Sequence, residues 1–440
     1  MECVRATRQM PREKCEALKA GFRASMERGL AGEESDLKML PSFVTALPTG
    51  AEAGTVYALD LGGTNFRVMR VVFAGAGAPA QTAFKAFALQ QTHMTGSGTA
   101  DLFPFLAACI RETVAELEGG LPPPDAPLPL GFTFSFPTTQ TALNRGTLLC
   151  WTKGFCAADC VGRDVVALLQ EALNALGVHV EVKALANDTV GTLMALRRTE
   201  PACCVGVIFG TGSNGCYVED MGKLAKWTGG AVASGVQCVN IEWGNFGELA
   251  ASRRLLPRTP CDDELDEASL NKGKQLLEKL VGGMYIGELV CRFFNAAADA
   301  GEVLRGRSER LLPATVTTEV ASLIEGGDVA AVEGIMRDVL GVSAPAHADA
   351  EALQAIACAV SSRGARVSAC AIGAILEHTQ RLGTRTAVAV DGSVFTKYTA
   401  FQARMEACLR AMYGADAALV ELLPSADGSG IGAAVIAATA

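Results

Sequence analysis

The feature that most constrains the fold is a pattern that occurs twice along the chain. Strand-like runs rich in Val and aromatic residues flank a glycine-rich turn at 55–73, and another such pair flanks a Gly/Thr turn at 203–220. A chain of 440 residues also exceeds the roughly 250–300 residues at which single cores stop growing. The sequence therefore predicts two α/β domains with a cleft between them. Helices are predicted at 11–31, 102–118, 165–176, 272–300, 317–340, 349–382 and 399–412, and further strands at 128–137, 179–188 and 386–392.

Charge and hydropathy exclude several classes of function. The formal net charge is −9, and no segment concentrates Lys or Arg. This argues against nucleic-acid binding and against a polybasic membrane patch. No apolar run approaches the ~18 residues needed to span a bilayer. We expect no nucleic-acid partner, no membrane span and a monomer.

The cysteines indicate a reducing compartment and no zinc motif. There are 15 of them, an odd number, and the first residues lack the apolar core of a signal peptide, so we expect reduced thiols and not a disulfide framework. The pairs Cys203/Cys204 and Cys156/Cys160 lack CxxC spacing, and the four histidines form no HExxH motif, so we expect neither a structural nor a catalytic zinc. We expect a cytoplasmic protein; the arginines at 5, 8 and 12 leave organellar import open.

Neither common nucleotide motif fits. A Walker A loop requires GxxxxGK[ST], but the two Gly-Lys pairs are followed by Leu224 and Gln275. Residues 210–215 satisfy GxGxxG after a predicted strand, yet the chain continues as strand and does not open a helix. A Rossmann site is therefore disfavoured.

The two glycine turns suit phosphate binding. Their backbone N–H groups and threonine hydroxyls can face phosphate oxygens, and glycine permits close approach and positive φ. Asp60 could hold Mg²⁺ through water, because Mg²⁺ gives up its hydration shell reluctantly. Two ordinary β-hairpins are the alternative explanation. The first turn contains Asp60, Gly62, Gly63, Thr64 and Asn65, and the second contains Gly210, Thr211 and Gly212.

Several segments together resemble one family. The stretch LGFTFSFPTTQTALNRGTLLCWTKGF at 130–155 is similar over its whole length to the sugar-binding signature of eukaryotic hexokinases and glucokinases. Other segments of that family follow in its order: LDLGGTNFR, ALANDTVGT, GTGSN, NIEWGNFGE, LEKLVGGMYIGE, VDGSVF and DGSGIGAA. The resemblance runs from about residue 37 to residue 440. The sequences of the segments SGVQCVNIEWGNF and KWTG most resemble those of plant and green-algal members.

The resemblance implies an α/β fold of the actin-like (ribonuclease H-like) type, a two-domain sugar kinase with an interdomain cleft. Mapped onto this chain, it implies an N-terminal helical segment over 1–55 that packs on the large domain. The small α/β domain would comprise 56–187 and 428–440, and the large α/β domain 188–427.

The resemblance also implies a set of site residues. Asp188 would be the general base, Lys153 would offset charge on the transferred phosphoryl group, and Asp60 with Asp188 would hold Mg²⁺ through water. Hexose contacts would come from Ser135, Thr152, Lys153, Asn187, Asp188, Asn214, Glu242 and Glu278. ATP contacts would come from Asp60, Gly62, Gly63, Thr64, Asn65, Arg67, Gly210, Thr211, Gly212, Gly392, Ser393, Asp427 and Gly428.

Structural roles compete with these assignments. Asn187 or Asp188 could simply cap the helix that starts near residue 189, because both residue types are strong N-caps. Lys153 could be a solvated loop charge, and Glu278 lies in the charged run KQLLEKL, where a solvent-facing position is usual. Two tryptophans, Trp151 and Trp243, are expected to support neighbouring polar residues by packing.

Two departures from the family pattern affect the nucleotide site. Some relatives have Lys where this chain has Met284, and that Lys can meet nucleotide phosphates. The nucleotide-contacting Thr and Ser residues of the family map only loosely onto 314–320.

The preferred interpretation is a Mg²⁺/ATP hexokinase that converts glucose and other hexoses to hexose 6-phosphate. A glucose sensor with little or no turnover is an alternative of a different class. An actin-like filament ATPase would share the phosphate turns, but it binds no sugar and would not require Ser135, WTKGF and Glu242.

Overall fold

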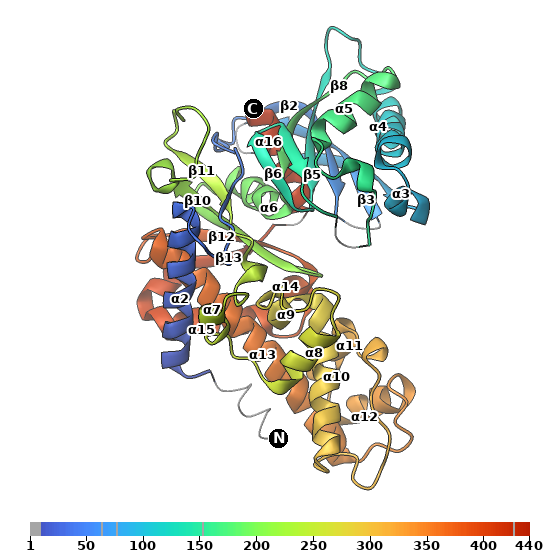
Figure 1. Ribbon diagram of the computed structural model, residues 1–440, viewed down its shortest axis with the longest axis vertical. Helices are drawn as coiled ribbons and strands as arrows, with labels where there is room; N and C mark the ends of the chain where they lie inside the picture. Colours follow the sequence, from blue (N-terminus) through green and yellow to red (C-terminus); the bar gives the residue numbers. More distant parts are fainter. Residues whose placement is uncertain (1–9, 63–64, 76–77, 152–153, 426) are drawn as a thin grey trace.

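The computed structural model describes residues 10–62, 65–75, 78–151, 154–425 and 427–440. Four predicted site residues lie outside these ranges: Gly63, Thr64, Thr152 and Lys153. The first few residues, with Arg5 and Arg8, lie outside them as well. Two lobes, each built around its own sheet, make an elongated molecule (Figure 1).

The smaller lobe contains a five-stranded sheet in the order β4-β3-β2-β5-β8. Tyr57 and Leu59 of β2 pack beneath α4 and α5 on one face, whereas Val56 and Ala58 pack on α16 on the other. This alternation is the period of two expected for a strand that is buried on both sides. The elements are β2 (Ala53–Leu61), β3 (Asn65–Ala74), β4 (Gln81–Ala88), α4 (Phe103–Glu118), β5 (Leu128–Phe134), α5 (Val165–Ala175), β8 (Val180–Ala186) and α16 (Gly428–Thr439).

The larger lobe contains a six-stranded sheet in the order β1-β11-β10-β9-β12-β13. Strands β9 and β10 form the second predicted hairpin, and β12 runs parallel to β9 and β13. One face packs on α6 and the other on a large helical core. The elements are β1 (Leu40–Pro41), α6 (Asp188–Arg197), β9 (Cys203–Phe209), β10 (Ser213–Asp220), β11 (Val236–Asn240), β12 (Thr386–Asp391) and β13 (Val420–Pro424).

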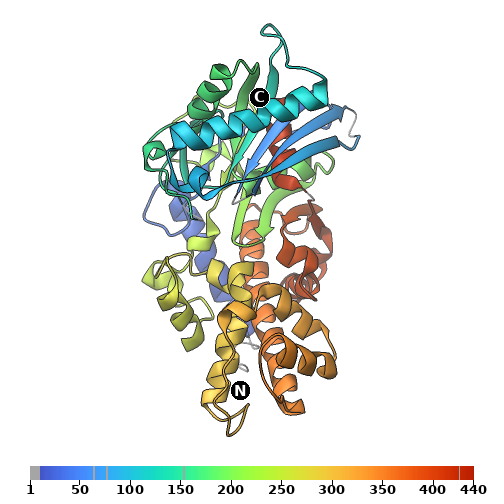
Figure 2. The same cartoon turned by 90° about the vertical axis from the view of Figure 1, so that its right-hand side faces the viewer.

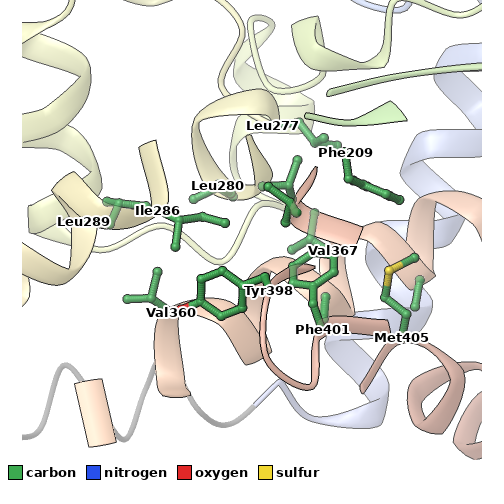
Figure 3. Packing of buried hydrophobic residues seen from close by; sticks show 14 of the residues in the cluster. Phe209, Leu277, Leu280, Ile286, Leu289, Val360, Val367, Tyr398, Phe401 and Met405 are labelled. Atoms are coloured by element: carbon green, nitrogen blue, oxygen red, sulfur yellow. The ribbon is translucent and has the colours of Figure 1, made fainter. Parts of the chain in front are cut away.

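The helices of the larger lobe extend away from the sheets (Figure 2) and share one apolar core around Phe209, Leu280 and Phe401 (Figure 3). The N-terminal helix α2 joins them, and Glu377 of α13 accepts hydrogen bonds from Lys19 at 2.7 Å and Arg23 at 3.1 Å. The helices are α2 (Arg12–Ala31), α7 (Ala250–Arg253), α8 (Pro260–Ala268), α9 (Glu278–Val281), α10 (Gly283–Asp299), α11 (Thr318–Gly326), α12 (Val329–Asp338), α13 (His347–His378), α14 (Ser393–Lys397) and α15 (Phe401–Tyr413).

Most predicted elements are confirmed, but two predicted helices are wrong as continuous units. The segment 272–300 divides at Gly282 into α9 and α10, and 317–340 divides at Gly327 into α11 and α12. Elements not predicted from the sequence include β4, β11, α8 and β13. They also include α3 (Gln91–Thr95), β6 (Thr138–Ala142), β7 (Arg145–Leu148) and a π-helical turn at Gly98–Leu102. Among the described residues, no helix has the length and apolar character needed to cross a bilayer.

Helices α6 and α16 form the layer between the two sheets. They approach at glycines: a Cβ on Gly432 would lie 1.9 Å from the carbonyl oxygen of Gly191, and a Cβ on Gly191 would lie 2.8 Å from that of Ser429. Because backbone meets backbone, neither helix can accept a side chain there without moving. Helix α6 begins at Asp188 and α16 begins at Gly428, so predicted site residues lie at the starts of both helices.

Candidate active site

Asp188 is the first residue of α6, where β8 ends. Asn187 is the N-cap, because its Oδ1 accepts the Thr189 N–H at 2.9 Å. Asp188 also accepts that N–H, at 2.8 Å, through Oδ1. The positive end of the helix favours a negative charge at this position. The capping role that both residues could have filled therefore belongs to Asn187, and Asp188 lies in the first turn.

A second group of charges surrounds the start of α16. Arg67 on β3 donates to Asp60 at 3.0 Å and forms an ion pair with Asp427. The Ser429 hydroxyl also donates to Asp60, at 2.9 Å. Burial acts to lower the pKa of Arg67, but its hydrogen bonds to Asp427 and Asp60 raise it overall. Arg67 thus joins the first predicted phosphate turn to the C-terminal helix.

Asp391 is a further acid in this region that the sequence analysis did not single out. It ends β12, and its carboxylate accepts the Gly392 N–H at 2.6 Å. Burial raises the pKa of Asp391, and the nearby carboxylates of Asp427 and Asp188 add to the effect. The acid was visible in VDGSVF, but only its position at the end of β12 brings it beside Asp188.

These carboxylates suit a hard cation. Mg²⁺ prefers oxygen ligands and retains several waters. Asp60 and Asp188 are half-buried and reachable by water. A divalent cation would also reduce the repulsion that raises the pKa of Asp391. The donor set therefore fits the ion that the sequence predicts.

A polar network on the larger lobe centres on Glu242. Its Oε1 accepts Asn240 Nδ2 at 2.8 Å and Asn214 Nδ2 at 3.2 Å. Glu242 has φ 56°, a left-handed conformation that is uncommon for a residue with a side chain. Such strain clusters at functional sites. Asn240 is a member that the sequence analysis did not single out, although it begins the segment NIEWGNFGE.

Glu278 points towards the second glycine turn and not to solvent. Its Oε2 accepts the Ser213 N–H at 2.9 Å, and a Cβ on Gly212 would lie 2.4 Å from this oxygen. The solvent-facing alternative for Glu278 is therefore wrong. Ser135 lies by the first turn, where a Cβ on Gly62 would be 3.7 Å from its Oγ. The sheets thus bring predicted hexose residues close to both turns.

Both tryptophans support the site by packing, as predicted. Trp243 is fully buried, donates to Ser213 Oγ at 2.9 Å and fills the space beside Gly215. Trp151 stacks on Phe155 and donates to the Ala157 carbonyl at 2.7 Å.

A pocket lies near the second turn, beyond the residues that hydrogen-bond to it. A Cβ on Gly392 would lie 2.3 Å from the Phe209 carbonyl, so the end of β12 touches the turn at Gly210. The N–H groups of Gly283 and Met284 donate to the carbonyls of Gly210 and Thr211 at 2.8 and 2.9 Å. Beyond them lies a pocket of about 430 Å³, lined by Gly283, Met284, Glu288, Pro313, Ala314, Val316, Thr317 and Thr318.

Two threonines of the segment 314–320, Thr317 and Thr318, line this pocket, whereas Thr315 does not. Thr318 donates to the Gly283 carbonyl and accepts the Gly287 N–H at 3.2 Å, so it fixes the start of α10. Met284 is 66% exposed on the pocket wall.

Comparison with known proteins gives the family. Residues 2–198 and 204–439 match the two family models described as Hexokinase. The chain belongs to the hexokinase family. Hexokinase-1 of Oryza sativa subsp. japonica is 40% identical over 95% of this chain and 86% of its own length. Hexokinase-2 of Arabidopsis thaliana is 40% identical over 94% of this chain and 84% of its own.

A solved structure extends the likeness to three dimensions. A hexokinase from Schistosoma mansoni complexed with glucose is 33% identical, has a TM-score of 0.88 and covers 100% of this chain and 98% of its own. The predicted actin-like, two-domain sugar-kinase fold is confirmed. Family membership makes the chain an enzyme, an ATP-dependent hexose kinase, and does not favour a sugar sensor without turnover.

Proposed function

We propose that this hexokinase phosphorylates the 6-hydroxyl of glucose and of other hexoses, with Asp188 as the general base. The supporting observation is the position of Asp188 in the first turn of α6, next to the capping Asn187. A carboxylate held there can accept the hydroxyl proton as the bond to phosphorus forms.

The hexose would lie between the two lobes. Glu242, Asn214 and Glu278 offer acceptors and donors from the larger lobe, and Ser135 offers a hydroxyl from the smaller one. Paired hydrogen bonds to vicinal hydroxyls compensate for desolvation of these polar groups and fix the orientation of the ring. Asn187, Thr152 and Lys153 would complete the contacts, the last two outside the described residues.

ATP would bind along the two glycine turns. Its phosphates would meet the first turn with Asn65 and Arg67 and the second turn at Thr211, and the adenosine side would face Gly392, Ser393 and the pocket beside Thr318. Asp427 and Gly428 would border the phosphates at the start of α16. Mg²⁺, held by Asp60 and Asp188 through water, would offset charge on the transferred phosphoryl group.

We also propose the domain division given above, in which the small domain closes on the sugar. Its boundaries at 187/188 and 427/428 coincide with the starts of α6 and α16, the helices that form the layer between the sheets. Closure would exclude water from the site. Small-angle scattering should show a smaller radius of gyration with glucose; an unchanged radius contradicts this proposal.

The test of the base is Asp188→Asn. We expect turnover in a coupled assay for hexose 6-phosphate to fall by roughly 10²–10⁴-fold, the usual contribution of general-base catalysis. Glucose binding, measured by calorimetry, should change little. Asp164→Asn is the matched control, since Asp164 caps α5 through the Val166 N–H and touches none of the site residues. If Asp188→Asn keeps most of its turnover, the assignment is wrong.

A further inference from the structure

Three cysteines from distant parts of the chain meet between three helices. Cys15 lies on α2, Cys370 on α13 and Cys408 on α15, and these helices pack together (Figure 1). Their sulfur atoms all lie within 4.8 Å of one another. Within the described ranges, no other group of three or more His, Cys, Asp or Glu side chains converges so closely. The sequence could not indicate this cluster, because its members follow no motif spacing.

The sulfur geometry is close to that of a thiolate metal site. Zinc–sulfur bonds of about 2.3 Å in a tetrahedron place the sulfurs roughly 3.8 Å apart. Three sulfurs within 4.8 Å of one another therefore occupy one face of such a tetrahedron after small side-chain movements. Soft thiolate ligands select cations such as Zn²⁺ and Cd²⁺ over Mg²⁺.

The surroundings of the three cysteines favour a bound cation whose fourth coordination position is open to solvent. Cys15 and Cys370 are buried, whereas Cys408 is only half-buried and gives access from solvent. The positive charge of Arg366 acts on Cys15 and would offset part of the negative charge of three thiolates around a divalent ion. Lys19 acts on Cys15 as well, but Glu377 and Glu16 pair with it and reduce its contribution. The Met10 carbonyl oxygen, 3.8 Å from Cys15 Sγ, faces the cluster from the N-terminal side.

We propose that Cys15, Cys370 and Cys408 bind a thiophilic divalent cation such as Zn²⁺ or Cd²⁺, with water in the fourth position. Binding would release a proton from each thiol that ionises. It would fasten α2 to α13 and α15 and so stabilise the larger lobe by linkage. None of these helices supplies a predicted hexose or nucleotide residue, so the site lies outside the kinase chemistry.

The test uses Cd²⁺ as the probe on the full chain, reduced and freed of metal by a chelator. We expect wild type to bind one more Cd²⁺ per chain than Cys408→Ser or Cys15→Ser, with a thiolate-to-cadmium absorbance band absent from both variants. Cys109→Ser, which removes a buried cysteine outside the cluster, should behave as wild type. Two single variants guard against a folding failure in either one.

A second readout is the melting temperature. Cd²⁺ should raise it in wild type and Cys109→Ser but not in Cys408→Ser, and Cys408→Ser should keep wild-type turnover. The proposal is overturned if Cys408→Ser binds as much Cd²⁺ as wild type. It is equally overturned if oxidation links two of the cysteines while the reduced chain binds no additional metal.

Discussion

The close approach of α6 and α16 gives a quantitative prediction for Gly432→Ala. The new Cβ would lie 1.9 Å from the Gly191 carbonyl oxygen and 2.2 Å from its carbon. Ordinary contact begins at 3.4 Å, so α16 would have to move from α6 by about 1.5 Å. Both partners are backbone, so no side-chain rotation can relieve the contact.

The expected free-energy change combines two opposing effects. Replacing Gly by Ala in a helix stabilises it by up to about 1 kcal/mol. Overpacking costs about 1–3 kcal/mol, and this contact belongs at the upper end because it is rigid. We expect Gly432→Ala to lower the stability by about 2 kcal/mol. Gly430→Ala is the matched control, since its Cβ would meet only the flexible end of Met69 at 3.1 Å.

Activity should respond more strongly than stability. Asp188 and Asp427 lie at the starts of the two helices, so a shift of α16 changes the distance between them. A misplacement of 1 Å can cost on the order of 100-fold in rate. Thermal unfolding and the coupled assay should place Gly432→Ala well below Gly430→Ala in both melting temperature and kcat. If the two variants match in both, tight packing does not set the spacing of the lobes.

Two further predictions concern single side chains at the site. Asp391→Asn should raise the melting temperature at pH 7. Burial and the carboxylates of Asp427 and Asp188 raise the pKa of Asp391, so the folded state binds the Asp391 proton more tightly than the unfolded state does. The contribution of Asp391 to stability therefore falls as the pH rises above the unfolded pKa of about 3.9. The gain should shrink towards pH 4, and a gain that is equal at both pH values contradicts the argument. Met284→Lys should lower the KM for ATP by roughly two- to fivefold, the range of an exposed ion pair, because residue 284 lies on the pocket wall by the second turn. The KM for glucose should not change, high salt should abolish the effect, and an unchanged KM for ATP at low salt argues against a phosphate at this wall.

The general architecture could be predicted because it follows from local patterns. The glycine turns at 55–73 and 203–220 and the periodicity around them depend on residues close in sequence. The breaks at Gly282 and Gly327 could not be predicted, because Gly within a helical pattern is only mildly unfavourable. At Gly283, contact with the distant Gly210 turn leaves no room for a Cβ, which only the fold reveals.

The site was predicted unevenly for the same reason. Asp188 and Glu242 were singled out within distinctive segments. Asn240 and Asp391 lie in such segments too, but their roles show only in their contacts: Asn240 binds Glu242 and the Asn214 side chain of β10, and Asp391 lies near Asp188 and Asp427. The choice between Asn187 and Asp188 as the cap also required geometry, since both residue types suit it equally.

The position of α16 along the chain has a consequence for biosynthesis. The strands β2, β5 and β8 leave the ribosome long before α16, which covers one of their faces through Ala433 and Ile436. At about 5–20 residues per second, roughly 10 to 50 seconds separate the end of β8 from the start of α16. During that interval the apolar face that carries Val56 and Ala184 lacks its native cover, so the nascent smaller lobe should be a target for chaperones.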